Sequence, residues 1–204
     1  VRLGERSCVL RRSADDTDPT ERVVVANANQ LVIVVAAANP QPRTGFIDRA
    51  VVAAYDAGIE PILCVTKTDI RHPQELLDYY QRSGLRIVLS AASDGRAPSE
   101  EGAEGLTTGP VRELLGDLLG NVSVLSGHSG VGKSTLVNAL TGAERATGHV
   151  NSVTGRGRHT SSSALALQPA SDAGVEVPPG TWIIDTPGIR SFGLAHVSTQ
   201  KVVE

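Results

Sequence analysis

The 204-residue chain contains no methionine, only two cysteines and a formal net charge of just −3. Because even an initiator methionine is missing, we expect a piece of a longer protein. Cys8 and Cys64 lie in strand-like segments and lack the CxxC spacing of a zinc site. They are typical of reduced core or edge residues in a cytoplasmic protein, and they exclude a cysteine-rich zinc site within this chain.

No apolar run approaches the ~20 residues that span a bilayer, and the beginning of the chain has no signal-peptide layout. We therefore expect no membrane partner. The slightly negative charge argues against a broad nucleic-acid-binding surface. Local basic clusters are usually solvated faces, but they could also touch RNA phosphates. These clusters are Arg2, Arg6, Arg11 and Arg12 near the start, and Arg156, Arg158 and His159 further along.

Apolar, β-branched runs alternate with segments of helical periodicity along most of the chain. The predicted strands are residues 31–37, 61–65, 86–90, 121–127, 164–168 and 181–184, with a shorter candidate at 8–10. The predicted helices are residues 46–58, 73–82, 110–119 and 133–140. Residues 94–109 are rich in Gly, Ser, Glu and Pro, which predicts a mobile loop. This alternation predicts a mostly parallel, doubly wound α/β sheet. Together with the phosphate loop described next, it predicts the three-layer α/β fold of P-loop NTPases.

The strongest motif is GHSGVGKS, Gly127–Ser134, which fits the pattern G-x-x-x-x-G-K-[ST] and is called the phosphate loop below. It follows an apolar strand and opens a helix, so its backbone N–H groups can converge on nucleotide phosphates. Lys133 is predicted to bridge the β- and γ-phosphates, and the Ser134 hydroxyl to bind Mg²⁺. A glycine-rich surface turn is the alternative. The predicted contacts are Gly127, His128, Ser129, Gly130, Val131, Gly132, Lys133, Ser134 and Thr135.

DTPG, Asp185–Gly188, is the predicted second switch. By itself this sequence is a common turn, but here it follows a strand and comes after the phosphate loop. Asp185 can then reach a magnesium ion, and the Gly188 N–H can bond the γ-phosphate. Ile189 stands where small GTPases often carry a water-orienting glutamine, so we expect slow intrinsic hydrolysis.

GRGRHT, Gly155–Thr160, lies where a first switch belongs. We favour Thr160 over Thr154 as the threonine that closes on Mg²⁺ and the γ-phosphate. His159 either orients the attacking water or is an exposed loop histidine. The predicted catalytic set is His159, Thr160, Lys133 and Gly188, and the predicted metal ligands are Ser134, Thr160 and Asp185.

TKTD, Thr66–Asp69, follows a predicted strand and is named here the base-reading loop. Asp69 could accept hydrogen bonds from the guanine N1–H and amine, a donor pair that adenine lacks. Lys67 would lie against the base, and SAAS (Ser90–Ser93) could offer a backbone N–H to the guanine oxygen. The predicted base contacts are Thr66, Lys67, Thr68, Asp69, Ser90 and Ala91. A helix cap or plain turn is the alternative reading.

The base-reading loop precedes the phosphate loop, whereas it follows the phosphate machinery in ordinary small GTPases. This order predicts a circularly permuted GTPase topology. With the motifs in the order TKTD, SAAS, GHSGVGKS, GRGRHT and DTPG, the chain resembles the RsgA (YjeQ) family over about residues 20–200. VVVANANQLVIVVAAANP, NVSVLSGHSGVGKSTLVNAL and DTPGIRSFGL extend the resemblance.

The resemblance implies hydrolysis of GTP to GDP and phosphate, with Mg²⁺, in late maturation of the small (30S) ribosomal subunit and with stimulation by the ribosome. It implies rRNA contacts mainly through an N-terminal OB-fold and a C-terminal zinc-binding domain. Residues 1–20 resemble the last strand and linker of that OB-fold, and residues 21–204 the permuted GTPase domain. Zinc is expected only in the domain that this chain lacks, and a monomer is expected by default.

The chain departs from the family pattern at two places. The family usually has Asn at Thr66, and losing that amide should weaken the tie between base-reading loop and phosphate loop. The usual RHTTT is RHTSS here, which retains Thr160. The alternatives are a permuted GTPase of large-subunit assembly, a nucleotide-gated ribosome-binding module with negligible turnover, and an ATP-using P-loop protein.

Overall fold

The computed structural model describes residues 5–13, 20–91, 109–143, 164–170, 175–189, 192–194 and 197. A six-stranded sheet with the order β5-β4-β3-β6-β8-β7 forms its centre. The strands are β3 (Gln30–Ala36), β4 (Glu60–Thr66), β5 (Arg86–Leu89), β6 (Val122–Gly127), β7 (Leu165–Leu167) and β8 (Trp182–Asp185). Among these described strands only β7 runs antiparallel to its neighbour, so the mostly parallel sheet is confirmed.

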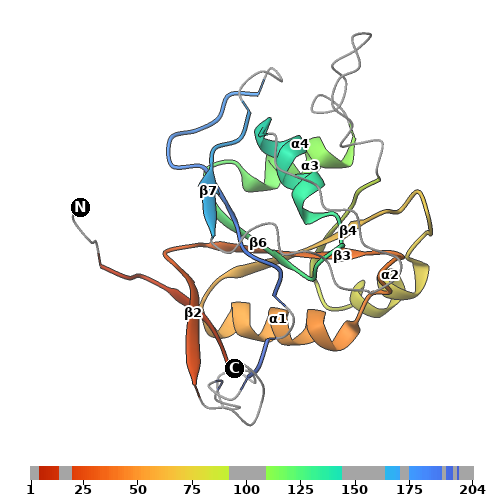
Figure 1. The fold of residues 1–204 in the computed structure, drawn as a ribbon, viewed down its shortest axis with the longest axis horizontal. Helices are drawn as coiled ribbons and strands as arrows, with labels where there is room; N and C mark the ends of the chain where they lie inside the picture. Colours follow the sequence, from red (N-terminus) through yellow and green to blue (C-terminus); the bar gives the residue numbers. More distant parts are fainter. Residues whose placement is uncertain are drawn as a thin grey trace.

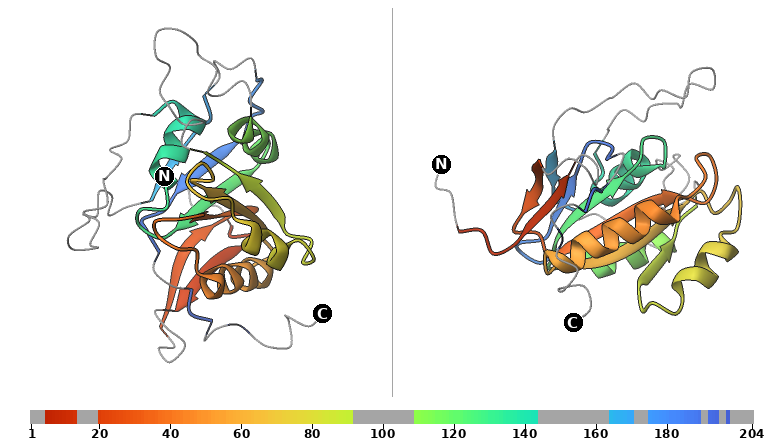
Figure 2. Two further views of the ribbon diagram at one scale, coloured as in Figure 1. Left: turned by 90° about the vertical axis from the view of Figure 1, so that its right-hand side faces the viewer. Right: turned by 90° about the horizontal axis from the view of Figure 1, so that it is seen from below.

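The four helices of the described residues cover the two faces of this sheet and make the predicted three layers; Figures 1 and 2 show this arrangement. α1 (Thr44–Asp56) and α2 (Gln74–Tyr80) lie below it in Figure 1, and α3 (Pro110–Leu118) and α4 (Lys133–Thr141) lie above it. Strand β3 contributes to both cores because alternate side chains point to opposite faces. Ile33 and Val35 pack with the α1 side, whereas Val32 and Val34 pack with the α3–α4 side.

A separate antiparallel pair, β1 (Val9–Ser13) with β2 (Glu21–Ala26), precedes the main sheet. Leu10 of β1 is fully buried in the core that α1 covers. The pair spans the boundary that sequence analysis places after residue 20. The sequence analysis did not predict β2 as a strand, although it quoted the VVV run of this strand.

The parallel topology brings four loops to one edge of the sheet, because the carboxyl ends of parallel strands lie together. The base-reading loop follows β4, Ser90 follows β5, the phosphate loop follows β6 and the second switch follows β8. The base-reading loop therefore comes first in the chain yet adjoins the phosphate loop in space, as a circular permutation requires.

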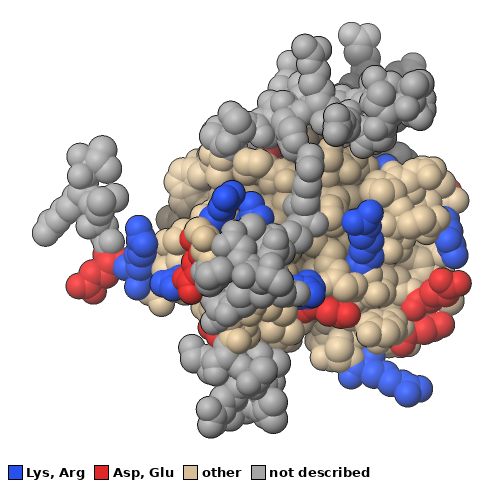
Figure 3. Space-filling model, turned by 60° about the horizontal axis from the view of Figure 1, so that its bottom comes forward, with Lys and Arg blue, Asp and Glu red and all other residues tan. Residues whose placement is uncertain are grey.

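The surface in the described part of the chain shows mixed charge. On the face seen in Figure 3, Lys and Arg side chains alternate with Asp and Glu rather than forming one continuous patch. None of the described helices has the length and apolar character needed to cross a membrane.

Candidate nucleotide-binding site

The phosphate loop connects β6 to α4 through a tight backbone turn. Gly130 and Gly132 have φ of 82° and 91°, in the left-handed region that glycine adopts without steric cost. A Cβ on Gly127 would lie 2.4 Å from the Val34 carbonyl oxygen, so only glycine allows the loop to leave the sheet this closely. Lys133 begins α4, and the structure places all the predicted phosphate contacts in this one turn and the first turn of the helix. These are Gly127, His128, Ser129, Gly130, Val131, Gly132, Lys133, Ser134 and Thr135.

Lys133 connects the phosphate loop to the second switch. Its side chain is buried, and its ammonium group donates to the Asp185 carboxylate and to the Thr186 carbonyl oxygen, the latter at 2.5 Å. Asp185 is also buried, so the pair is a charge-assisted contact in a setting of little solvent. Two of the residues predicted to act on the nucleotide, 52 positions apart, are thereby brought together.

The donors near this pair suit magnesium. Asp185 supplies a carboxylate and Ser134, next to Lys133, a hydroxyl, and hard oxygen donors are what Mg²⁺ prefers. In the described ranges, no group of three or more His, Cys, Asp or Glu side chains is placed to hold a metal ion. This set fits a metal that is shared with nucleotide oxygens and water, which is how Mg²⁺ is usually bound in phosphate-transfer sites.

The second switch packs directly against the phosphate loop. A Cβ on Gly188 would lie 3.3 Å from the Ser129 backbone nitrogen, and the Ile189 N–H donates to the Gly127 carbonyl at 3.1 Å. Ile189 itself is 5% exposed and belongs to the core on the α1 side. Its side chain is therefore part of the packing and is not available to orient a water molecule.

An aromatic contact fixes the other side of the phosphate loop. The ring centroids of His128 and Phe46 of α1 are 4.4 Å apart. Those of Phe46 and Phe192, which lies beyond the second switch, are 5.7 Å apart. Burial, and secondarily the neighbouring Arg43 charge, lowers the pKa of His128. His128 Nε2 is buried and has no hydrogen-bond partner in the described structure. The neutral imidazole thus acts as a packing group at this position.

The base-reading loop and the segment after β5 are bonded to each other. The Thr68 backbone N–H and hydroxyl both donate to the Ser90 carbonyl oxygen, at 3.2 Å and 3.1 Å. The Ser90 N–H in turn donates to Val65 at 2.8 Å. Asp69 follows Thr68 in an exposed turn at the edge of the sheet. Its charge lies close enough to Lys67 to act on the pKa of that side chain.

Lys67 has an unusual backbone conformation, with φ of 58°. Its ammonium group donates to the Asn39 carbonyl and, at 2.7 Å, to the Gly130 carbonyl of the phosphate loop. Burial lowers the pKa of Lys67, and the nearby Asp69 charge opposes this. Thr66, which is buried, places its hydroxyl against the Val131 carbonyl. Thr66 therefore still ties the base-reading loop directly to the phosphate loop, and the expected weakening relative to Asn stays a prediction.

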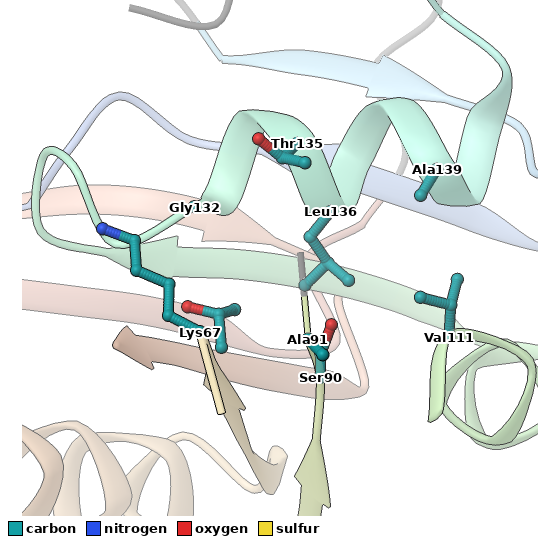
Figure 4. A pocket seen from close by; sticks show the side chains of 9 residues that line it. Lys67, Ser90, Ala91, Val111, Gly132, Thr135, Leu136 and Ala139 are labelled. Atoms are coloured by element: carbon teal, nitrogen blue, oxygen red, sulfur yellow. The ribbon is translucent and has the colours of Figure 1, made fainter. Parts of the chain in front are cut away.

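A cavity of about 110 Å³ lies between the base-reading loop and α4 (Figure 4). Its lining contains four predicted base contacts and two predicted phosphate-loop contacts: Thr66, Lys67, Ser90, Ala91, Gly132 and Thr135. Sequence analysis missed three apolar lining residues, Val111 of α3 and Leu136 and Ala139 of α4. The i, i+3 spacing of Leu136 and Ala139 could have indicated one face of α4, but nothing in the sequence places Val111 beside it.

Several predicted residues lie outside the described residues. These include His159 and Thr160 of the predicted first switch and the alternative threonine, Thr154. The loop predicted over residues 94–109 also lies outside them, apart from Gly109. Their roles stay predictions.

Comparisons with known proteins agree with this geometry. A family model described as RsgA GTPase matches residues 3–195. A Pseudomonas aeruginosa protein named small ribosomal subunit biogenesis GTPase RsgA is 39% identical over 186 residues, covering 88% of this chain and 48% of that protein. A Chlorobaculum tepidum protein of the same name is 37% identical over 210 aligned positions, covering 99% of this chain and 61% of that protein. The chain thus spans about half to three-fifths of the length of these relatives.

Solved structures support the same topology. YjeQ from Thermotoga maritima aligns with a TM-score of 0.56 and 25% identity, covering 97% of this chain and 56% of that one. YloQ, described as a circularly permuted GTPase, aligns with a TM-score of 0.58 and 20% identity, covering 98% and 55%. At 20% identity, the similarity to YloQ supports the fold alone. Taken with the arrangement of the phosphate loop, second switch and base-reading loop, these matches show that the chain belongs to the RsgA GTPase family.

Proposed function

We propose that the chain binds guanine nucleotides with Mg²⁺ and hydrolyses GTP to GDP and phosphate. One observation carries this proposal: the phosphate loop and base-reading loop, in permuted order, meet around a single cavity. The base contacts are Thr66, Lys67, Thr68, Asp69, Ser90 and Ala91, with Asp69 reading the guanine edge. An adenine would leave the Asp69 carboxylate without its two donors, which is the physical basis of base selection.

The proposed chemistry is in-line attack of water on the γ-phosphate, aided mainly by positioning and charge neutralisation. Lys133 exchanges its Asp185 and Thr186 contacts for the β- and γ-phosphate oxygens, and the Gly188 N–H bonds the γ-phosphate. Ser134, Asp185 and Thr160 would hold Mg²⁺, which supplies neutralisation of the phosphate charge when bound. His159 is the candidate for orienting the water. Since Ile189 is buried in the core, we propose that hydrolysis is slow until a partner completes the site.

We propose the small ribosomal subunit as that partner, acting late in its maturation and in the cytoplasm. The names of the relatives support this assignment. We further propose that residues 1–20 are the remainder of an OB-fold, that residues 21–204 are the GTPase domain, and that most rRNA contacts and any zinc belong to domains beyond this chain. A monomer is the simplest state consistent with these proposals.

The nucleotide assignment is tested by competition of GDP, GTP and ATP against a fluorescent guanine nucleotide in the presence of Mg²⁺. We expect GDP and GTP to displace the probe and a large excess of ATP to leave it bound. Equal competition by ATP would favour an ATP-using P-loop protein and would remove the role assigned to Asp69.

The partner assignment needs a second experiment, multiple-turnover hydrolysis of GTP with purified small or large ribosomal subunits. We expect stimulation by the small subunit. Stimulation by the large subunit alone would indicate a GTPase of large-subunit assembly. A flat rate with either subunit, despite nucleotide binding, would indicate a nucleotide-gated binding module instead.

A further inference from the structure

The side chain of Phe46 contacts two separate parts of the nucleotide site. It projects from the first turn of α1 and is buried. Its ring contacts the ring of His128 in the phosphate loop, with centroids 4.4 Å apart. It also contacts the ring of Phe192, which follows the second switch, with centroids 5.7 Å apart. One side chain outside the motifs therefore touches both segments that are proposed to meet the γ-phosphate.

The same two segments also meet through their backbones. A Cβ on Gly188 would lie 3.3 Å from the Ser129 backbone nitrogen, and the Ile189 N–H donates to the Gly127 carbonyl at 3.1 Å. His128 directly precedes Ser129, so the ring contact with Phe46 lies next to this backbone contact. The spacing between the phosphate loop and the second switch therefore depends on the packing around Phe46 as well as on the backbone.

The chain that leaves the second switch is packed into the core that α1 covers. Phe192 is fully buried, and its carbonyl oxygen accepts a hydrogen bond from Arg49 of α1 at 3.4 Å. Ile189, immediately after the second switch, is buried in the same core. Because protein interiors are close-packed, Phe192 cannot move away without leaving a cavity beside Phe46. The position of the second switch is thereby fixed relative to α1.

The position of the His128 ring depends on packing. Its Nε2 atom is buried and has no hydrogen-bond partner in the described structure. That nitrogen gives the ring no directional restraint, and the aromatic contact with Phe46 takes this role. The start of the phosphate loop is thus also fixed relative to α1.

We propose that Phe46 is a positioning residue for the γ-phosphate. Through His128 and Phe192 it fixes the spacing between the phosphate loop and the second switch, so that the Gly188 N–H stays directed at the γ-phosphate. GDP lacks this phosphate, and its binding depends on the phosphate loop rather than on this spacing. The proposal rests on the guanine-nucleotide site proposed above and adds a residue outside the motifs that sets its geometry.

The test compares GDP with the β,γ-imido analogue of GTP, which resists hydrolysis, as competitors of a fluorescent guanine nucleotide with Mg²⁺. Phe46→Leu removes the ring and keeps a buried apolar side chain. We expect it to weaken binding of the analogue about five- to ten-fold, because an N–H that is no longer held in place loses its hydrogen bond to the γ-phosphate. GDP binding should change by less than about two-fold, so the analogue-to-GDP affinity ratio falls.

Phe192→Leu removes the other ring and should lower the same ratio. The double variant should lower it no further than the more affected single variant, because both substitutions break one connection. Phe192→Leu also provides the answer if Phe46→Leu fails to fold.

Tyr80→Phe is the matched control at the same helix. The Tyr80 hydroxyl donates to the Asp48 carboxylate at 2.6 Å and lies 3.2 Å from the Thr44 carbonyl oxygen, both in α1. The variant therefore loosens the contact between α2 and α1 without altering the contacts of Phe46 with the site. It should lower the unfolding temperature of the nucleotide-free chain and leave the analogue-to-GDP ratio within about two-fold of that of the unaltered chain.

The positioning role is overturned if the ratio is unchanged in both Phe46→Leu and Phe192→Leu, or if Tyr80→Phe lowers it equally. Equal loss of GDP and of the analogue in Phe46→Leu would also overturn it, since the effect would then not be specific to the γ-phosphate. If the unaltered chain bound neither nucleotide, the proposed function itself would fail. Normal binding by the unaltered chain, with unchanged ratios in the variants, would remove the role of Phe46 alone.

Discussion

At the scale of single residues, threonine hydroxyls bonded to backbone carbonyls hold much of the site together. Thr66 donates to Val131, Thr68 to Ser90 at 3.1 Å, and Thr186 to Leu125 at 2.8 Å. Each bond joins a loop to a different strand or loop. The sequence locates these threonines next to motifs, but their acceptors depend on how segments distant in the chain approach one another. Sequence reasoning therefore predicted a tie at Thr66 and not its acceptor, the Val131 carbonyl.

His128 leads to a prediction about pH. Burial lowers the pKa of His128 in the folded chain. In the unfolded chain the pKa returns to about 6.5, so the unfolded chain binds the proton more readily. The free energy of unfolding should therefore fall as the pH drops below that value. His128→Gln should make the free energy of unfolding depend less steeply on pH. Chemical denaturation of the nucleotide-free chain at several pH values from 8 to 5 measures it.

The pH 8 measurements serve as the internal control, since the imidazole is neutral there in both the folded and unfolded states. A slope in His128→Gln equal to that of the unaltered chain would show that His128 is not the group responsible.

At the scale of elements, apolar packing of helices onto the sheet outweighs the ion pairs between them. α3 contributes fully buried Leu114, Leu115 and Leu118 to the core it shares with α4. The same helix is joined to β5 by Arg86, which pairs with Glu113 at 2.6 Å and Asp117 at 3.0 Å. Arg86 is 43% exposed, so solvent screens these pairs.

This contrast predicts unequal effects of two substitutions on the same helix interface. Leu114→Ala should lower the free energy of unfolding by about 2–5 kcal/mol, because it removes buried methyl groups and leaves a cavity. Arg86→Ala should cost less than about 1 kcal/mol. Urea denaturation of both variants tests the ranking. A larger cost for Arg86→Ala than for Leu114→Ala would show that the ion pairs, and not the core, hold α3 in place.

Local pattern was sufficient to predict most helices and strands, because each apolar run lies within a single element. The run at 31–37 became β3, and Pro110 begins α3 as expected from its fixed φ. Strand β2 was missed because its VVV run lies between an acidic segment and the polar ANAN, and its partner β1 lies outside the main sheet. The contribution of Val111 to the cavity was missed for a similar reason, since only tertiary packing brings α3 beside α4.

At the scale of the whole molecule, the two cysteines differ in burial, since one lies in the core and the other at the edge of the fold. Cys64 is fully buried in the central sheet, and burial raises the pKa of its thiol to about 12. Because the thiolate is the reactive form, Cys64 should not be alkylated in the native chain. Cys8 is partly exposed and contacts the Ala28 carbonyl at 2.7 Å. We expect one thiol to react natively and the second only on unfolding.

Cys8→Ser and Cys64→Ser assign the two reactions by time-resolved alkylation and mass spectrometry. Rapid native labelling of Cys64 would mean that the central sheet opens far more often than its burial implies.

The permuted strand order also bears on synthesis. β3, β4 and β5 form the half of the sheet that carries the base-reading loop, yet β3 pairs on its other side with β6, residue 30 opposite residue 123. A chain made from its amino end therefore completes the base-reading half while one edge of its most apolar strand still lacks a neighbour. Unpaired edges of this kind invite association with other chains. We therefore expect the pairing of β6 with β3 both to bring the phosphate loop to the base-reading loop and to cover this open edge.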